Sequence, residues 1–96
     1  MYSRNKWYSV LEASPKKDGL YYVFISNCMD NSNEIRKLEY KNKRWSISNN
    51  NYNKILAWKM IARKNIFDEE AWLKNHINEI QLAFHNDKIK YNDCFI

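Results

Sequence analysis

The sequence is poor in glycine and proline: it has one glycine, Gly19, and one proline, Pro15, among 96 residues. A glycine-rich phosphate loop and a proline-rich linker are therefore excluded. No apolar run reaches the roughly 18 residues that a membrane-spanning helix needs. The N-terminus, MYSRNKWYSV, lacks the apolar block of a signal peptide. We therefore expect a cytoplasmic protein without membrane contact.

Residues that carry chemistry are also few. Cys28 and Cys94 lie far apart and form no CxxC pair, so in a reducing compartment we expect two thiols, with a disulfide or a reactive thiol as the alternative. His76 and His85 are nine residues apart, whereas a metal site on one helix needs a spacing of three or four. No paired carboxylates lie in a recognisable acid–base arrangement. We therefore predict no catalytic residue, no metal and no cofactor.

The chain is rich in hydrophobic residues, which make up 45% of it, and in aromatic residues, which make up 16%. That is enough for one core, so we expect a single domain over residues 1–96. Residues 7–11 fit a short strand or a lead-in. Residues 20–26 are apolar on both faces and predict a central strand. Residues 34–40 alternate in polarity, and residues 44–48 continue that pattern beyond a turn at Asn42-Lys43.

The clearest element is a helix over residues 68–86. Asp68 is a good N-cap, and Phe67 can pack on Trp72 as a hydrophobic staple. Glu69 and Glu70 would lie near the positive end of the helix dipole. One apolar face recurs at helical spacing. It consists of Leu73, Ile77, Ile80 and Phe84.

The stretch ILAWKMIARK, residues 55–64, fits a buried strand or a buried helix by periodicity alone. As a strand it would place Ile55, Ala57 and Ile61 on one side, and Leu56, Trp58 and Met60 on the other. Lys59 would then have to reach solvent past an edge of the sheet, or mark a partner-binding face. The predicted fold is α+β: a small antiparallel β-meander of about four strands packed by one C-terminal helix.

A resemblance favours the strand. Trp7-Tyr8-Ser9-Val10, Pro15, Gly19, Trp45 and Ala57-Trp58-Lys59-Met60 follow one another at plausible spacings. Over about residues 7–61 this pattern resembles a small domain family of unknown function, common in phages and prophages, with the signature W-x-S-V-x-E-x-x-P, a G-x-W hairpin and W-M-P-L-P. The closing prolines of that signature are absent here. The resemblance implies an accessory protein of a mobile element in a bacterial host cell, and it supplies no catalytic residues.

Two charged surfaces are candidates for binding. Residues 36–64 carry nine Lys and Arg side chains against Glu39 alone, whereas residues 65–87 are acidic. The predicted basic interaction surface consists of Arg36, Lys41, Lys43, Arg44, Lys54, Lys59, Arg63 and Lys64. The secondary candidate, an acidic helix face that could mimic a phosphate backbone, consists of Glu69, Glu70, Glu79 and Asp87.

These observations predict a non-enzymatic accessory protein that acts by protein binding, as an inhibitor of a host defence system such as a CRISPR effector. Its partner would be a host protein or ribonucleoprotein complex. The alternative is a single-stranded nucleic-acid-binding protein, because lysines interleaved with Tyr40, Trp45, Tyr52 and Trp58 could hold a backbone and stack on bases. A third alternative is a protein whose function is only assembly.

Overall fold

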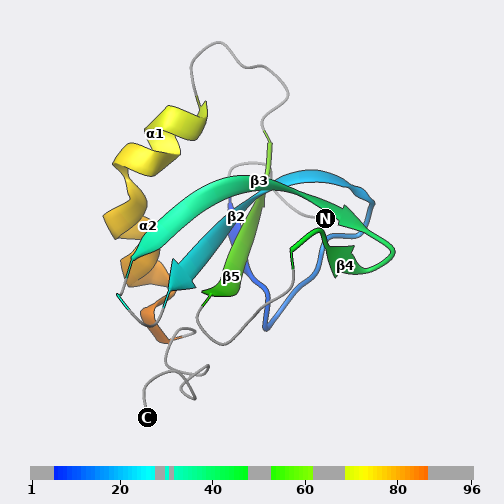
Figure 1. The fold of residues 1–96 in the computed structure, drawn as a ribbon, viewed down its shortest axis with the longest axis horizontal. Helices are drawn as coiled ribbons and strands as arrows, with labels where there is room; N and C mark the ends of the chain where they lie inside the picture. Colours follow the sequence, from blue (N-terminus) through cyan, green and yellow to red (C-terminus); the bar gives the residue numbers. More distant parts are fainter. Residues whose placement is uncertain (1–5, 28–29, 31, 48–52, 62–68, 87–96) are drawn as a thin grey trace.

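The structure is a computed structural model, and it describes residues 6–27, 30, 32–47, 53–61 and 69–86. Five antiparallel strands form one curled sheet in the order β1-β5-β2-β3-β4, and two short helices cover one of its faces (Figure 1). The strands are β1 (Trp7–Ser9), β2 (Gly19–Asn27), β3 (Asn33–Lys41), β4 (Arg44–Trp45) and β5 (Asn53–Met60). The helices are α1 (Glu69–Asn75) and α2 (Ile77–Ala83).

The predicted α+β class is confirmed, but the predicted meander is wrong at its last strand. The chain forms a meander only through β2, β3 and β4, and β5 then returns to lie between β1 and β2. Residues Ile55 to Lys59 of β5 are all buried, as expected for a strand inside the sheet with both faces covered. The two-residue strand β4 is too short to pair along the whole of β5, whereas the nine-residue strand β2 is long enough.

A β-bulge in β5 changes which of its side chains share a face. Phe24 pairs with Ala57 but the next residue of β2 pairs with Ile55, so Leu56 is the extra residue. Leu56 and Ala57 therefore both face the helices, while Ile55 and Trp58 face the other way. The strict alternation predicted for residues 55–61 is wrong at Ile55 and Leu56, because a bulge leaves no signature in apolar periodicity.

The sheet has a hydrophobic core on each face. On the helix side, Leu73 and Ile80 pack against side chains of β2, β3 and β5, among them Phe24 and Ile35. On the opposite side Trp58 is fully buried. The sheet curls there, so side chains of the edge strands β1 and β4 and of the segments that follow them close over this second core. They include Tyr8, Val10, Ala13, Trp45 and Ile47.

The predicted single helix is interrupted at His76. The His76 N–H is shared between the carbonyl oxygens of Trp72 and Leu73, and the residue adopts φ −109° and ψ 20°, which divides the helix into α1 and α2. The predicted apolar face is nevertheless confirmed. Leu73 and Ile80 are buried, and Ile77 and Phe84 pack against the same core.

The N-cap and staple predicted at Asp68 and Phe67 lie outside the described residues. Trp72, the other half of that staple, is 49% exposed and stacks on His76 with ring centroids 3.9 Å apart.

Lys59 points beneath the first turn of α1. Its Nζ lies 2.7 Å from Glu69 Oε2 and donates a second hydrogen bond to the Met60 carbonyl oxygen at 3.0 Å. Both charged side chains are only 7% exposed. The predicted route to solvent is therefore wrong: Lys59 is neutralised inside the fold.

A second charge pair joins α1 to the sheet. Lys37 Nζ lies 3.8 Å from Glu70 Oε1. The strand register places Lys37, Tyr22 and Lys59 in one row, and the two ammonium groups lie 5.6 and 6.0 Å from the centre of the Tyr22 ring. Electrostatic attraction to the ring adds to both ion pairs. The consecutive acids Glu69 and Glu70 thus fix the start of α1 over two lysines of the sheet that lie on either side of Tyr22.

Candidate interaction surface

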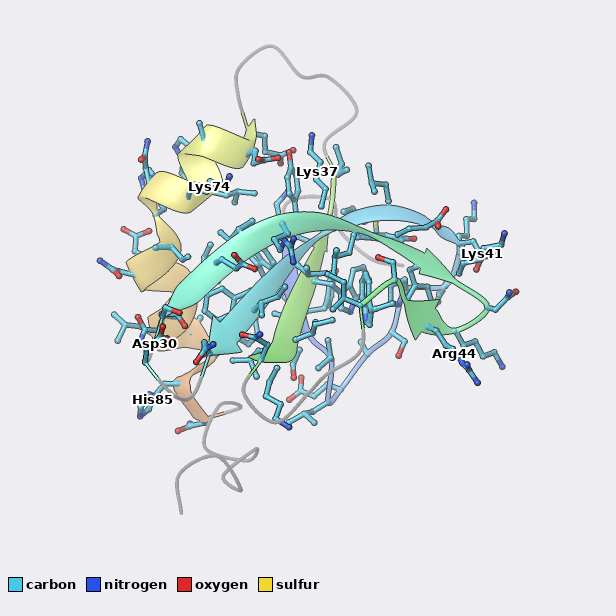
Figure 2. All side chains as sticks on the ribbon, viewed as in Figure 1. Asp30, Lys37, Lys41, Arg44, Lys74 and His85 are labelled. Carbon is cyan, nitrogen blue, oxygen red and sulfur yellow. The ribbon has the colours of Figure 1, made fainter. Side chains whose placement is uncertain are left out.

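The β3–β4 hairpin presents three basic side chains at one end of the sheet. Asn42 and Lys43 have φ values of 54° and 64°, so the two-residue turn has the positive φ angles of type I′. Lys41 and Arg44 pair directly across it. The side chains of Lys41, Lys43 and Arg44 are all exposed. Lys41 and Arg44 lie at the end of the molecule opposite the helices (Figure 2).

Two further lysines join this hairpin. Gly19 pairs with Tyr40, so the turn before β2 lies beside the β3–β4 turn. The Tyr21 hydroxyl donates a hydrogen bond of 2.7 Å to the Lys17 carbonyl oxygen, which holds the turn before β2 against that strand. We call the resulting set the basic tip. It consists of the exposed residues Lys16, Lys17, Lys41, Lys43 and Arg44.

Charge counting along the sequence missed Lys16 and Lys17, because Glu12 and Asp18 balance them there. The antiparallel pairing of residues 20–26 with 34–40 was the available signal. That pairing necessarily brings the turn that precedes the first strand beside the turn that follows the second.

The turn offers a stability test that also serves as a control for function. Lys43 adopts a left-handed conformation that disfavours L side chains. Lys43→Gly should therefore raise the free energy of unfolding by about 0.5–1 kcal/mol, despite the greater flexibility of glycine in the unfolded chain. Urea denaturation measures this change. If Lys43→Gly instead lowered the free energy of unfolding by a similar amount, the result would contradict the type I′ turn.

The remaining residues of the predicted basic surface do not join the tip. Arg36 is exposed on β3, and its Nε lies 3.5 Å from Glu34 Oε1. Lys54 pairs with Ser26 at the far end of β2, and Lys59 is buried. Arg63 and Lys64 lie outside the described residues.

The aromatic residues near the tip lie in the core rather than on its surface. Trp58 is fully buried and its Nε1 donates to the Ala13 carbonyl oxygen at 3.1 Å. Tyr40 is buried, and the half-buried Trp45 packs edge-on against it with centroids 4.8 Å apart. Tyr52 lies outside the described residues. Tyr40 and Trp58 therefore provide no open face on which a base could stack, and Trp45 is half-buried.

The acidic helix face is also smaller than predicted. Glu69 is buried against Lys59, and Glu70 contacts both Lys37 and Lys74, the latter at 3.0 Å. Of the four predicted acids, Glu79 alone is exposed among the described residues, and Asp87 lies outside them. The described part of this face does not form a row of anionic groups.

The rest of the described surface offers little for small-molecule or metal chemistry. A half-open cleft of about 230 Å³ lies between β1 and the end of α2, lined by Lys6, Trp7, Glu12 and Phe84, among others. Within the described residues, no three His, Cys, Asp or Glu side chains gather where they could hold a metal ion. Nor does any helix in that part of the chain have the length and apolar character needed to cross a bilayer.

Comparisons with known proteins give no match: none to a family model, to a curated protein or to a solved structure. The resemblance to the phage and prophage domain family therefore stays a prediction.

Proposed function

We propose that this chain is a non-enzymatic protein that acts by binding an acidic surface of a partner protein through its basic tip. The observation that carries the proposal is the strand pairing that brings two turns, distant in sequence, to one end of the sheet, where they expose five cations against the acids Asp18 and Glu39. A complementary acidic patch would be attracted over a distance of about a Debye length, roughly 8 Å at physiological salt.

The surroundings of the tip favour a protein over a nucleic acid as partner. Leu20 follows Gly19 at the base of the tip and is 52% exposed, so it offers an apolar contact beside the charges. Stacking on bases would require exposed rings, whereas Tyr40 and Trp58 are buried. The tip is also held by the Tyr21–Lys17 hydrogen bond and by the packing of Trp45, so little conformational entropy would be lost on binding.

The biological setting that we propose is a phage or other mobile element, and the partner is a host defence protein or ribonucleoprotein such as a CRISPR effector. This part of the proposal rests on the predicted family resemblance, the small size and the lack of a recognisable catalytic motif. Inhibition would follow if the basic tip occupied a surface that the effector needs for its own activity.

The test is a charge reversal in the tip. Lys43→Glu combined with Arg44→Glu should weaken inhibition of a susceptible defence nuclease at least 100-fold, because each reversal replaces an attraction by a repulsion worth about 1.4 kcal/mol or more. The matched control is Lys6→Glu with Lys74→Glu, which changes the net charge equally away from the tip. Nuclease activity measured across a panel of host defence systems provides the readout. Unaltered inhibition by the tip variant would contradict the proposal.

Single-stranded nucleic acid is the second candidate, because the same five cations could follow a phosphate backbone. Binding by charge alone would have a log–log salt slope of about −3 to −4 for five phosphate contacts. If the protein binds single-stranded DNA or RNA with such a slope but inhibits no nuclease in the panel, this second candidate replaces the first.

A further inference from the structure

The helices cover only part of the sheet face on which they lie. Figure 1 shows α1 and α2 at the end of the sheet opposite the β3–β4 turn. The first turn of α1 lies over the row formed by Lys37, Tyr22 and Lys59, where Glu69 and Glu70 hold it. Between this row and the turn, no helix of the described residues covers the sheet, and the side chains there are exposed.

Strand alternation identifies the side chains on this uncovered part. Leu20 lies two residues before Tyr22, which packs on the helix-side core, and it pairs with Glu39, so both point to the helix side. Lys41 lies two residues beyond Glu39 on the same face, and Arg44 pairs with Lys41 across the turn. All four are exposed, Leu20 to 52%. We call this set, Leu20, Glu39, Lys41 and Arg44, the bare end of the helix side.

We propose that the bare end of the helix side binds an acidic amphipathic helix of the partner protein, which continues the layer begun by α1. This inference rests on the proposed function, and it names the partner's element and the face of the tip that it contacts. Carboxylates of that helix would pair with Lys41 and Arg44, and an apolar side chain would pack on Leu20. On the opposite face, Tyr40 and Trp45 pack on each other instead.

A helix fits this position better than an extended segment. A segment laid on the face of a sheet cannot bond to the backbone of its strands, because those groups lie in the plane of the sheet. An extended segment would therefore bury unpaired N–H and C=O groups, whereas a helix bonds its own. The spacing also agrees. Along the strand direction the rows of Leu20 and Lys41 are about 7 Å apart, and residues four apart on a helix are about 6 Å apart.

Glu39 gives the bare end a direction. It lies beside Leu20 in the cross-strand register, and it would repel a carboxylate placed over that leucine. The acids of the partner helix are therefore confined to the stretch over Lys41 and Arg44, and its apolar residue to the stretch over Leu20. A uniformly acidic surface would bind less well than an amphipathic helix with acids at one end of its apolar stripe.

The first experiment titrates the full chain into synthetic peptides. The probe is a lactam-stapled helical peptide of about 15 residues, with leucines along one stripe and glutamates at one end of it. Its control is the same sequence without the staple and with a central proline, which breaks the helix. Fluorescence anisotropy should show tighter binding of the helical peptide, by about tenfold or more. Equal affinity for the two peptides, or binding of a single-stranded oligonucleotide but of neither peptide, would overturn the proposal, as would no binding at all.

The second experiment compares matched variants in their binding to the helical peptide. Leu20→Ala should weaken binding about fivefold to tenfold, because it removes the apolar contact, whereas Leu82→Ala, at an exposed leucine of α2, should not. Lys41→Glu should weaken binding about tenfold or more. Arg36→Glu makes the same charge change on the opposite face of β3, so its effect should be about threefold or less. Equal effects within either matched pair would overturn the proposal.

The same variants separate this inference from the proposed function when nuclease inhibition is measured. Inhibition should be lost with Lys43→Glu combined with Arg44→Glu, and weakened by Leu20→Ala and by Lys41→Glu. If only the double variant has an effect, the tip binds by another face and this inference alone is overturned. If none of the variants alters inhibition, the proposed function fails as well.

Discussion

Glu69→Ala should lower the free energy of unfolding by about 3–5 kcal/mol, because it leaves the buried Lys59 ammonium without its counter-charge. The two groups are 2.7 Å apart and each is 7% exposed. A loss of this size is a large share of the 5–15 kcal/mol typical of a folded domain. The control is Glu70→Ala, which removes a partly exposed acid one residue away and should cost about 1 kcal/mol or less. Chemical denaturation measures both.

A double variant keeps this prediction decisive even if Glu69→Ala does not fold. Lys59→Met with Glu69→Leu replaces the pair by apolar groups of similar volume, and should recover most of the lost stability. If Glu69→Ala is no less stable than Glu70→Ala, the ion pair does not hold α1 on the sheet. If the double variant is as unstable as Glu69→Ala, the cost comes from something other than an uncompensated charge.

Trp58→Ala should lower the free energy of unfolding by about 3–5 kcal/mol, because it empties the centre of the core opposite the helices. The ring is fully buried and stacks on Tyr8 with centroids 5.0 Å apart. Trp58→Phe keeps most of this volume but leaves the Ala13 carbonyl oxygen without the indole N–H, so it should cost about 1–3 kcal/mol. Thermal denaturation ranks the three proteins.

The Trp58→Ala variant also distinguishes a tryptophan of the core from a tryptophan that stacks on nucleic-acid bases. If Trp58→Ala retained wild-type stability and instead abolished binding to single-stranded nucleic acid, the ring would be a contact residue and the buried aromatic core would be wrong.

Most of the elements could be predicted from the sequence because their signals are local. Alternation defined β3, continuous apolarity defined β2, and helical spacing placed Leu73, Ile77, Ile80 and Phe84 on one face. The partner of β5 could not be predicted, because an apolar strand buried on both faces fits beside any other strand. The bulge at Leu56 and the interruption at His76 have no local signature either.

The candidate site was predictable only in part for a similar reason. The hairpin cations Lys41, Lys43 and Arg44 follow from a turn that the sequence indicates. In the sequence, Lys59 is one of several lysines in a basic segment. Only the structure shows that Lys59 is the buried counter-ion of Glu69. Lys16 and Lys17 join the site through strand pairing, which charge counting along the chain does not detect.

The central claim, that the basic tip binds a protein, is tested most directly by affinity capture from nuclease-treated lysate of phage-infected cells, with wild type and three variants as bait. We predict that wild type and the Lys6→Glu, Lys74→Glu control capture the same host defence protein, and that Lys43→Glu with Arg44→Glu does not. Lys43→Gly should retain capture, since it removes one of five charges without reversal. Equal capture of that protein by the tip variant would contradict the claim.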